Sequence, residues 1–304
     1  MDIEKYNAIR DGATGMYEQP RGLIAVWGKE AVPFLDGLIS NNVKALAEGE
    51  QMLAAFPNAQ GRLLAVVRVL RQGDRFLFET ESSTREKVHQ NLFRFTLAGD
   101  FFVEDISDNY RFADVINFGS PVPVSALRLS GRGFDTVAIP EGVWSDFRNS
   151  LGDGNRVEID DELYETLRIE SGIPKYGADM DETTIVPELG LDGLISYNKG
   201  CYIGQEIIAR IHFRGHVAKQ LTGIVLSSPP YEGGVAAGRG GSLGGTDLTT
   251  AEAKNAGRIT STTFSPKLDR SIALAYVRYD YLAEGTELSA GDHTATVTPL
   301  PFIK

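Results

Sequence analysis

The sequence predicts an α+β protein that ends in a small antiparallel β-barrel. The first half alternates strand-like and helix-like segments, whereas from residue 221 onward short strand-like runs recur with glycine-rich or polar turns. A chain of 304 residues is also longer than one hydrophobic core usually serves. We therefore expect two or three domains, with a boundary near Lys219 that separates residues 1–218 from residues 219–304.

The N-terminal region begins with a strand, a turn and a helix, followed by a hairpin. Residues 23–27 are apolar and predict a strand, and residues 29–38 predict a short helix after Gly28. Two apolar runs at residues 62–70 and 75–80 flank a Gly-Asp pair, which is a strong hairpin signal.

Helix and strand signals then continue to the middle of the chain. Residues 84–97 predict a helix with Thr84 as its N-cap and one apolar face. Residues 160–171 predict a second helix that ends before Gly172. The remaining predicted strands of this part are residues 101–106, 111–116 and 127–139.

The predicted barrel strands are short and evenly spaced, as is typical of small all-β domains. They are residues 221–226, 258–263, 271–279, 287–290 and 294–299. The glycine-rich residues 233–245 lack the Gly-Lys-Ser/Thr ending of a phosphate-binding loop, so we interpret them as a hairpin loop.

Charge and composition exclude several classes of protein. With 41 acidic and 30 basic residues the formal net charge is −11, which disfavours direct binding of nucleic acid. No apolar run is long enough to span a bilayer, and the first residues do not resemble a secretory signal. We expect a cytoplasmic protein that does not bind membranes.

Cys201 is the single cysteine of the chain. It excludes an internal disulfide and a structural zinc site built on two or more thiolates. One thiol also cannot hold an iron-sulfur cluster alone. No metal site is therefore expected within the chain.

Cys201 lies between glycines, close to Lys199 and ahead of a helix predicted to start near Gly204. A helix N-terminus and a neighbouring ammonium both favour a thiolate, so Cys201 is a candidate functional thiol supported by Lys199. Ile203, Ile207 and Ile211 are spaced to form one buried helical stripe.

Two other interpretations of Cys201 remain open. An isolated intracellular cysteine is commonly a small buried apolar residue. A cysteine hydrolase would require His212 or His216 to reach the thiol, but the sequence places no orienting group or oxyanion hole beside them.

Residues 199–206, Lys-Gly-Cys-Tyr-Ile-Gly-Gln-Glu, resemble the signature of the YgfZ family. Similarity extends over residues 60–62, 167–174 and 185–188, and over 257–261, 265–266, 273–277 and 301–302 near the end. The resemblance implies the aminomethyltransferase-like fold, with two interwoven α+β domains around a central channel and a C-terminal antiparallel β-barrel. It also implies tetrahydrofolate binding and a role in maintaining iron-sulfur enzymes, including some that modify tRNA.

The related aminomethyltransferases carry a key Asp at a position that corresponds to Val66 here. An isopropyl group cannot accept a proton or pair with a cation, so we expect no efficient glycine-cleavage activity.

The resemblance also suggests residues that hold folate. Asp135 and Tyr164 correspond to two folate contacts of the transferases, although a turn residue and a packed helix residue are alternative roles for them. Basic groups near the signature would receive the anionic glutamate tail. The predicted folate-binding residues are Asp135, Tyr164, Lys199, Gln205 and Arg210, with Arg214 as a further cation.

The sequence thus predicts a folate-binding accessory protein whose partners are folate and iron-sulfur client or assembly proteins. One alternative is an aminomethyltransferase or other folate-dependent one-carbon enzyme. Another is a protein-binding module that keeps the fold but has lost folate.

Overall fold

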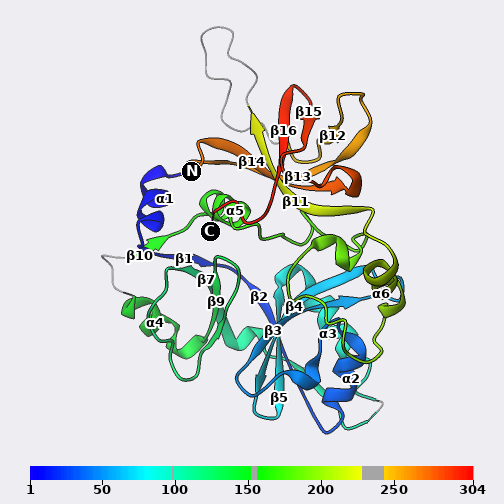
Figure 1. Cartoon of the computed structure of the whole chain (residues 1–304). Helices are drawn as coiled ribbons and strands as arrows, with labels where there is room; N and C mark the ends of the chain where they lie inside the picture. Colours follow the sequence, from blue (N-terminus) through cyan, green and yellow to red (C-terminus); the bar gives the residue numbers. More distant parts are fainter. Residues whose placement is uncertain (98, 152–155, 228–242, 304) are drawn as a thin grey trace.

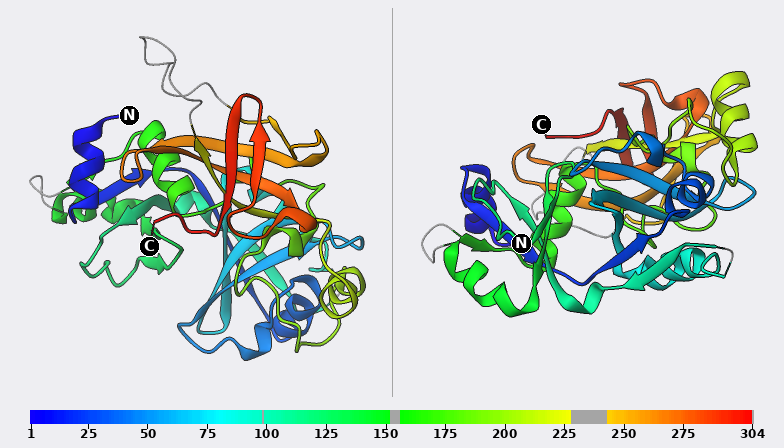
Figure 2. Two further views of the ribbon diagram at one scale, coloured as in Figure 1. Left: turned by 45° about the horizontal axis from the view of Figure 1, so that its top comes forward. Right: turned by 90° about the horizontal axis from the view of Figure 1, so that it is seen from below.

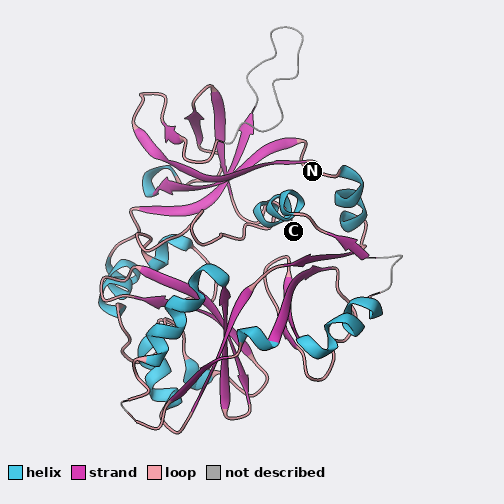
Figure 3. Cartoon of the chain, turned by 180° about the vertical axis from the view of Figure 1, so that it is seen from behind, coloured by secondary structure: helices cyan, strands magenta, loops and turns pink. Residues whose placement is uncertain are grey.

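The protein consists of two mixed sheets and a barrel, seen in a computed structural model that describes residues 1–97, 99–151, 156–227 and 243–303. In Figure 1 the barrel, in yellow to red, lies above the two sheets, and helix α5 (Asp161–Glu170) lies between the barrel and the sheets. The view from behind shows the same three parts (Figure 3). The α+β class with a C-terminal antiparallel barrel is confirmed.

The two sheets are interwoven along the chain. The first sheet has the strand order β10-β1-β7-β9-β8, and the second has the order β3-β4-β5-β2-β6. The chain therefore leaves the first sheet after β1, completes the second, and then returns. The first sheet contains β1 (Thr14–Glu18), β7 (Tyr110–Ile116), β8 (Leu127–Leu129), β9 (Asp135–Pro140) and β10 (Arg156–Glu158); the second contains β2 (Arg21–Trp27), β3 (Gln51–Pro57), β4 (Leu63–Gln72), β5 (Arg75–Glu81) and β6 (Phe102–Asp105).

The predicted hairpin is β4 and β5. Gln72 pairs with Arg75 across a two-residue turn, and Gly73 adopts a φ of 63°, which favours glycine. The burial of β4 alternates strictly over most of its length, so one face packs in the core and the other faces the centre of the molecule.

The helices lie on the outer faces of the sheets, except for α5. Besides α5 they are α1 (Ile3–Arg10), α2 (Ala31–Leu38), α3 (Arg85–Phe93), α4 (Trp144–Ser150) and α6 (Gln205–Arg214), with short 3₁₀ turns η1 (Val43–Ala45), η2 (Ser82–Thr84), η3 (Ser107–Asn109), η4 (Glu141–Val143), η5 (Val186–Leu189) and η6 (Tyr279–Tyr281). In both views of Figure 2, α1 and α6 lie at opposite flanks. No helix in the described ranges is long and apolar enough to cross a membrane.

Two predicted elements differ in detail. Helix α3 ends at Phe93 instead of Leu97. Thr84 does occupy its N-cap position, but its side chain makes no capping hydrogen bond, because its hydroxyl donates to the carbonyl of Glu81 at 3.0 Å. The predicted extended segment 127–139 is two strands, β8 and β9, joined by a turn in which Gly133 has a φ of 76°.

The barrel is closed, in the order β11-β14-β13-β12-β15-β16. Its strands are β11 (Lys219–Ser227), β12 (Asp247–Thr249), β13 (Asn255–Ser265), β14 (Arg270–Arg278), β15 (Glu287–Ala290) and β16 (His293–Thr298). All five predicted strands are present, and the three-residue β12 is an additional one. Residues 233–242 of the predicted glycine-rich loop lie outside the described residues.

Helix α5 joins the three parts. Asp160 caps it by accepting a hydrogen bond from the Leu163 N–H at 2.9 Å. The fully buried Glu170 accepts from Tyr6 at 2.7 Å, and also from Arg10 of α1 and Ser265 of β13. The helix is therefore a rigid support beside the centre of the molecule.

Candidate functional site

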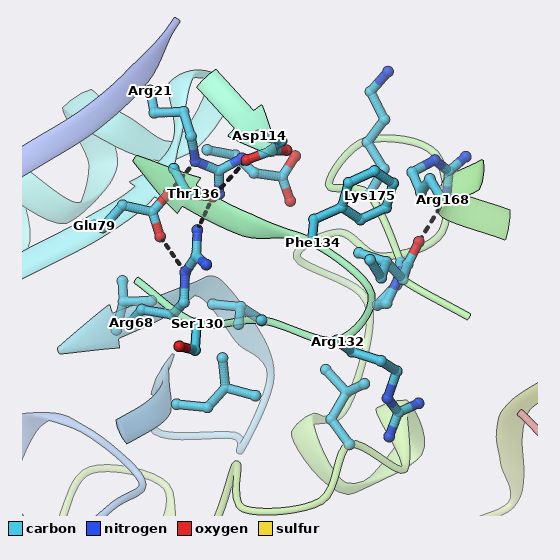
Figure 4. A pocket seen from close by; sticks show the side chains of 18 of the residues that line it. Arg21, Arg68, Glu79, Asp114, Ser130, Arg132, Phe134, Thr136, Arg168 and Lys175 are labelled. Atoms are coloured by element: carbon cyan, nitrogen blue, oxygen red, sulfur yellow. Dashed lines mark hydrogen bonds and ion pairs between the residues drawn. The ribbon is translucent and has the colours of Figure 1, made fainter. Parts of the chain in front are cut away.

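A cavity of 470 Å³ lies where the two sheets meet helix α5. Figure 4 shows its polar side chains gathered into two groups, with Phe134 between them. The apolar part of the wall contains Met52, Leu53, Val66, Val67, Phe134, Tyr164, Ile173, Pro174, Met180 and Leu191. The lining comes from both sheets, from α5 and from the loops that follow it.

The inner group is built on Glu79 of β5. Its carboxylate accepts from Arg21 and from the Nε of Arg68 at 2.7 Å, and its side chain is fully buried. Burial raises the pKa of Glu79, but the two guanidinium groups outweigh this effect and lower the pKa to about 2. Glu79 is therefore a fixed carboxylate.

Arg68 couples the two sheets. Its Nη1 donates to the carbonyl of Leu129 at 3.0 Å, and its Nη2 donates to the hydroxyl of Thr136 in β9 at 2.5 Å. The network continues to Asp114 of β7, which accepts from Thr136, Gln19 and, at 2.8 Å, the hydroxyl of Tyr164.

Tyr164 of α5 lines the cavity, as its predicted role requires. Its ring stacks on Tyr17 with centroids 4.0 Å apart and packs beside Phe134. Burial and the neighbouring Asp114 carboxylate raise the pKa of Tyr164, so the phenol stays neutral. The alternative role, a packed helix residue, also describes this side chain, which is 8% exposed.

The outer group of the cavity is cationic and partly open to solvent. Arg132 lies 3.8 Å from the fully exposed Asp192, and Lys175 donates to Glu165 at 2.9 Å. Their side chains are 35% and 49% exposed, so a ligand can compete for both. Arg168 is different, because it is buried and held by Asp179 at 2.7 Å.

Val66 also lines the cavity. The position predicted to correspond to the key acid of the transferases therefore faces the cavity, and here it presents an apolar side chain.

Asp135 does not line the cavity, so the structure does not bring this predicted folate contact to the site. Phe134 and Thr136 face the cavity. Because side chains alternate along β9, Asp135 points to the other face, where it pairs with Arg128 at 2.5 Å. Asp135 anchors a strand edge instead.

Lys199, predicted to support Cys201 and to bind folate, is buried and does not line the cavity. Its side chain is 1% exposed, and its Nζ donates to the carbonyls of Ile39 at 2.9 Å and Asn41 at 2.7 Å. The same nitrogen lies 3.2 Å from Asp36 of α2. Burial lowers the pKa of Lys199, and Asp36 opposes this effect. With these partners, Lys199 fastens the chain to the C-terminal end of α2.

Cys201 is an exposed free thiol, so the interpretation as a buried apolar residue is wrong. The following turn is fixed by the Ile203 N–H, which donates to Gly37 at 3.0 Å. Gly204 has a φ of 80°, and a Cβ there would lie 2.4 Å from the carbonyl of Asn58.

The predicted isoleucine stripe of α6 is not observed. Ile208 is the buried residue of this helix, while Ile203 is 37% exposed. Gln205, Arg210 and Arg214 belong to α6 and do not line the cavity, so the structure does not bring these predicted residues to it.

The two histidines proposed as bases are engaged elsewhere. The ring of His212 stacks on Tyr197 and that of His216 on Tyr279, each with centroids 3.6 Å apart. No group of three or more His, Cys, Asp or Glu residues suited to a metal ion occurs among the described residues.

The charged residues that dominate the cavity were not among the predicted site residues; they are Arg21, Arg68, Glu79, Glu81 and Asp114. A signal was available in the period of two along the hairpin. Arg68 shares a strand face with Val66, and Glu79 and Glu81 share one with Leu77. Charges on an apolar strand face indicate a polar site within the fold.

The sequence and the fold are similar to those of known proteins. The family model of the glycine cleavage T-protein C-terminal barrel domain matches residues 219–304. The "Iron-sulfur cluster assembly factor IBA57 homolog, mitochondrial" of Mycosarcoma maydis is 29% identical over 225 residues, 66% of this chain and 54% of that protein. The chain thus spans about half the length of this relative.

A second relative and a solved structure extend the comparison. The "tRNA-modifying protein YgfZ" of Shigella sonnei is 26% identical over 219 residues, 64% of this chain and 66% of that protein. The crystal structure of the glycine cleavage system aminomethyltransferase T from Bartonella henselae superposes with a TM-score of 0.84 at 19% identity, covering 99% of this chain and 89% of that one. The C-terminal barrel therefore matches the glycine cleavage T-protein barrel family, and the chain is similar in sequence to YgfZ and IBA57 proteins and in fold to an aminomethyltransferase.

Proposed function

We propose that this chain is a tetrahydrofolate-binding accessory protein that supports the assembly or repair of iron-sulfur clusters in client enzymes, including enzymes that modify tRNA. The observation that carries the proposal is the cavity between the sheets, which combines an apolar wall, a fixed ionic network and a cationic mouth. The names of two relatives, a cluster assembly factor and a tRNA-modifying protein, support the choice of clients.

The cavity fits a folate in size and in chemistry. Its 470 Å³ lies within the range of about 300–1,000 Å³ typical of small-molecule sites. The rings of Phe134 and Tyr164 offer aromatic surface for a pterin, and Arg132 and Lys175 offer charge for the glutamate carboxylates. When bound, tetrahydrofolate supplies amine nitrogens that can carry a one-carbon unit.

Val66 favours an accessory role over the aminomethyltransferase activity. The fixed carboxylate Glu79 is neutralised by two arginines, so it does not replace a free acid. We expect no glycine cleavage when the protein is supplied with a lipoyl carrier protein. Turnover in that assay would favour the transferase instead.

Cys201 enters the proposal as a contact to a partner protein, or as a transient ligand of sulfur or iron, because it is exposed away from the cavity lining. The client or assembly proteins would dock there, and the expected place of action is the cytoplasm. In a strain that lacks the gene, a Cys201→Ala variant should fail to restore iron-sulfur enzyme activity. Full restoration would remove the thiol from the proposal.

The folate part is tested by anaerobic calorimetric titration with tetrahydrofolate. We expect saturable binding that weakens in Arg132→Ala, which loses a cation of the mouth, and is unchanged in Asp135→Ala, which alters a carboxylate outside the cavity. Absence of binding at high ligand concentration would leave a partner-binding protein on a transferase fold.

A further inference from the structure

The carboxylates that line the cavity differ in how many ion pairs and hydrogen bonds they already make within the protein. Glu79 is paired with two arginines, and Asp114 accepts three side-chain hydrogen bonds. Asp192 is fully exposed at the mouth. Glu81 is bonded by a single donor, the backbone N–H of Tyr176, which is 3.1 Å from each carboxylate oxygen. Among the described residues, no side chain donates to Glu81.

Glu81 lies across from Val66 on the neighbouring strand. Thr80 pairs with Val67, so the antiparallel register places Glu81 opposite Val66, with both side chains on one face. The hydroxyl of Thr80 donates to the carbonyl of Val66 at 3.1 Å and fixes this edge. Both Glu81 and Val66 line the cavity. The site therefore has a carboxylate beside the position where the transferases carry theirs, but on a different strand.

The position of Glu81 is well fixed. The Thr84 hydroxyl donates to the backbone carbonyl of Glu81 at 3.0 Å and lies 2.7 Å from the hydroxyl of Thr80. On the other side, the hydroxyl of Tyr176 accepts from the Nζ of Lys87 at 2.9 Å. A carboxylate held in this way is preorganised to bind a ligand.

The two oxygens of an ionised carboxylate can accept about four hydrogen bonds. At Glu81 the protein supplies one donor, the Tyr176 N–H, which the two oxygens share. Burial raises the pKa of Glu81, and neighbouring Glu79 adds to this effect, while Arg21, the Tyr176 N–H and Arg168 oppose it. Donors from a ligand would favour the ionised form further, so binding would release protons from the carboxyl group.

We propose that Glu81 is the residue that recognises the ring of the ligand, by accepting hydrogen bonds from the adjacent N–H donors of a 2-aminopyrimidinone edge such as that of a pterin. A planar carboxylate matches two parallel N–H groups and binds them more strongly than a neutral amide does. This inference rests on the proposed function and assigns to Glu81 the contact that the sequence had suggested for Asp135. The alternative is a purely structural role, in which Glu81 only anchors the backbone at Tyr176.

The test compares the wild type with Glu81→Gln and with the control Asp135→Asn. The Gln side chain keeps an acceptor for the Tyr176 N–H but loses the charge and half of the acceptor capacity. Each protein is first checked by thermal melting and then titrated anaerobically with tetrahydrofolate at pH 5, in two buffers of different ionisation enthalpy. The difference between the buffers gives the number of protons released.

We expect the Kd of Glu81→Gln to rise by roughly ten- to one-hundred-fold, as for the loss of hydrogen bonds to a charged group. The variant should also release fewer protons than the wild type, while Asp135→Asn should match the wild type in both measurements. An unchanged Kd, or a weaker Kd with the same proton release, would overturn the inference and leave folate binding intact. Absence of binding by the wild type would instead overturn the proposed function and the inference together.

Discussion

The cavity and the signature segment, residues 199–206, are built in opposite ways. The cavity collects side chains from Gln19 to Asp192, which belong to two sheets, a helix and several loops. The signature segment is contiguous, lies at the flank of α2 and exposes its thiol. A contiguous motif can be identified in a sequence, whereas a site assembled from distant residues becomes visible when the fold brings them together.

Charge distinguishes the two regions as well. The cavity keeps Glu79 and its arginines buried in one network, which holds the two sheets together. In the signature segment the buried charge is Lys199, and the free thiol, Cys201, is exposed. We therefore expect substitutions of the cavity network to cost stability, and substitutions of the exposed thiol to affect function alone.

The largest expected effect is that of Glu79→Gln. It removes the counterion of two cations, Arg21 and Arg68, in a buried site, so the free energy of unfolding should fall by about 3–5 kcal/mol. Urea denaturation would measure it. The control is Glu158→Gln, which alters the surface pairs of this partly exposed carboxylate with Arg148 and Arg156 and should cost less than about 1 kcal/mol. Equal effects of the two variants would contradict the role of the network.

The same network predicts how stability depends on acid pH. The folded pKa of Glu79 is lowered from 4.5 to about 2, so its contribution is fully present above pH 4.5 and is lost as the pH falls toward 2. The wild type should lose about 3 kcal/mol of unfolding free energy over this interval from this group. Denaturation at several pH values would show a flatter profile for Glu79→Gln. Parallel profiles would rule out the assigned pKa.

A smaller loss is expected for Lys199→Met in the signature segment. The substitution keeps the apolar stem but leaves the carbonyls of Ile39 and Asn41 without their donor, at a cost of about 2–3 kcal/mol. Asp36 keeps Lys44 at 3.0 Å as a partner. Amide hydrogen exchange should rise at the end of α2 and in residues 199–204. If exchange and unfolding do not change, Lys199 does not fasten this segment.

The smallest effect on stability is expected for Cys201→Ser. The side chain is exposed and the two residues are similar in size, so the unfolding free energy should stay within about 0.5 kcal/mol of the wild type. Together with Lys199→Met, this variant separates the structural from the chemical residue of the signature. A large loss of stability in Cys201→Ser would show that the thiol is part of the packing.

The fold was predictable from local signals because they agreed with the final packing. Local physical causes explain the turn at Gly73, the N-cap at Asp160 and the regular spacing of the barrel strands. Strands β10 and β12 were missed because a three-residue strand carries too little periodicity to detect, and the longer β1 and β3 were not predicted either.

The candidate site was predictable only in part. Tyr164 and Val66 were placed correctly at the cavity, but Asp135 was not, because one step along β9 reverses the face of the sheet. The partners of Lys199 are carbonyls about 160 residues away in the sequence, which no motif indicates.

The most direct test of the account is a crystal structure of the protein with tetrahydrofolate, grown under anaerobic conditions. We predict ligand density in the cavity between Val66 and Tyr164, with the glutamate tail toward Arg132 and with Cys201 free of contact. Density beside Cys201 and α6, or an empty cavity at a saturating concentration, would contradict the separation of a ligand-binding interior from a reactive surface.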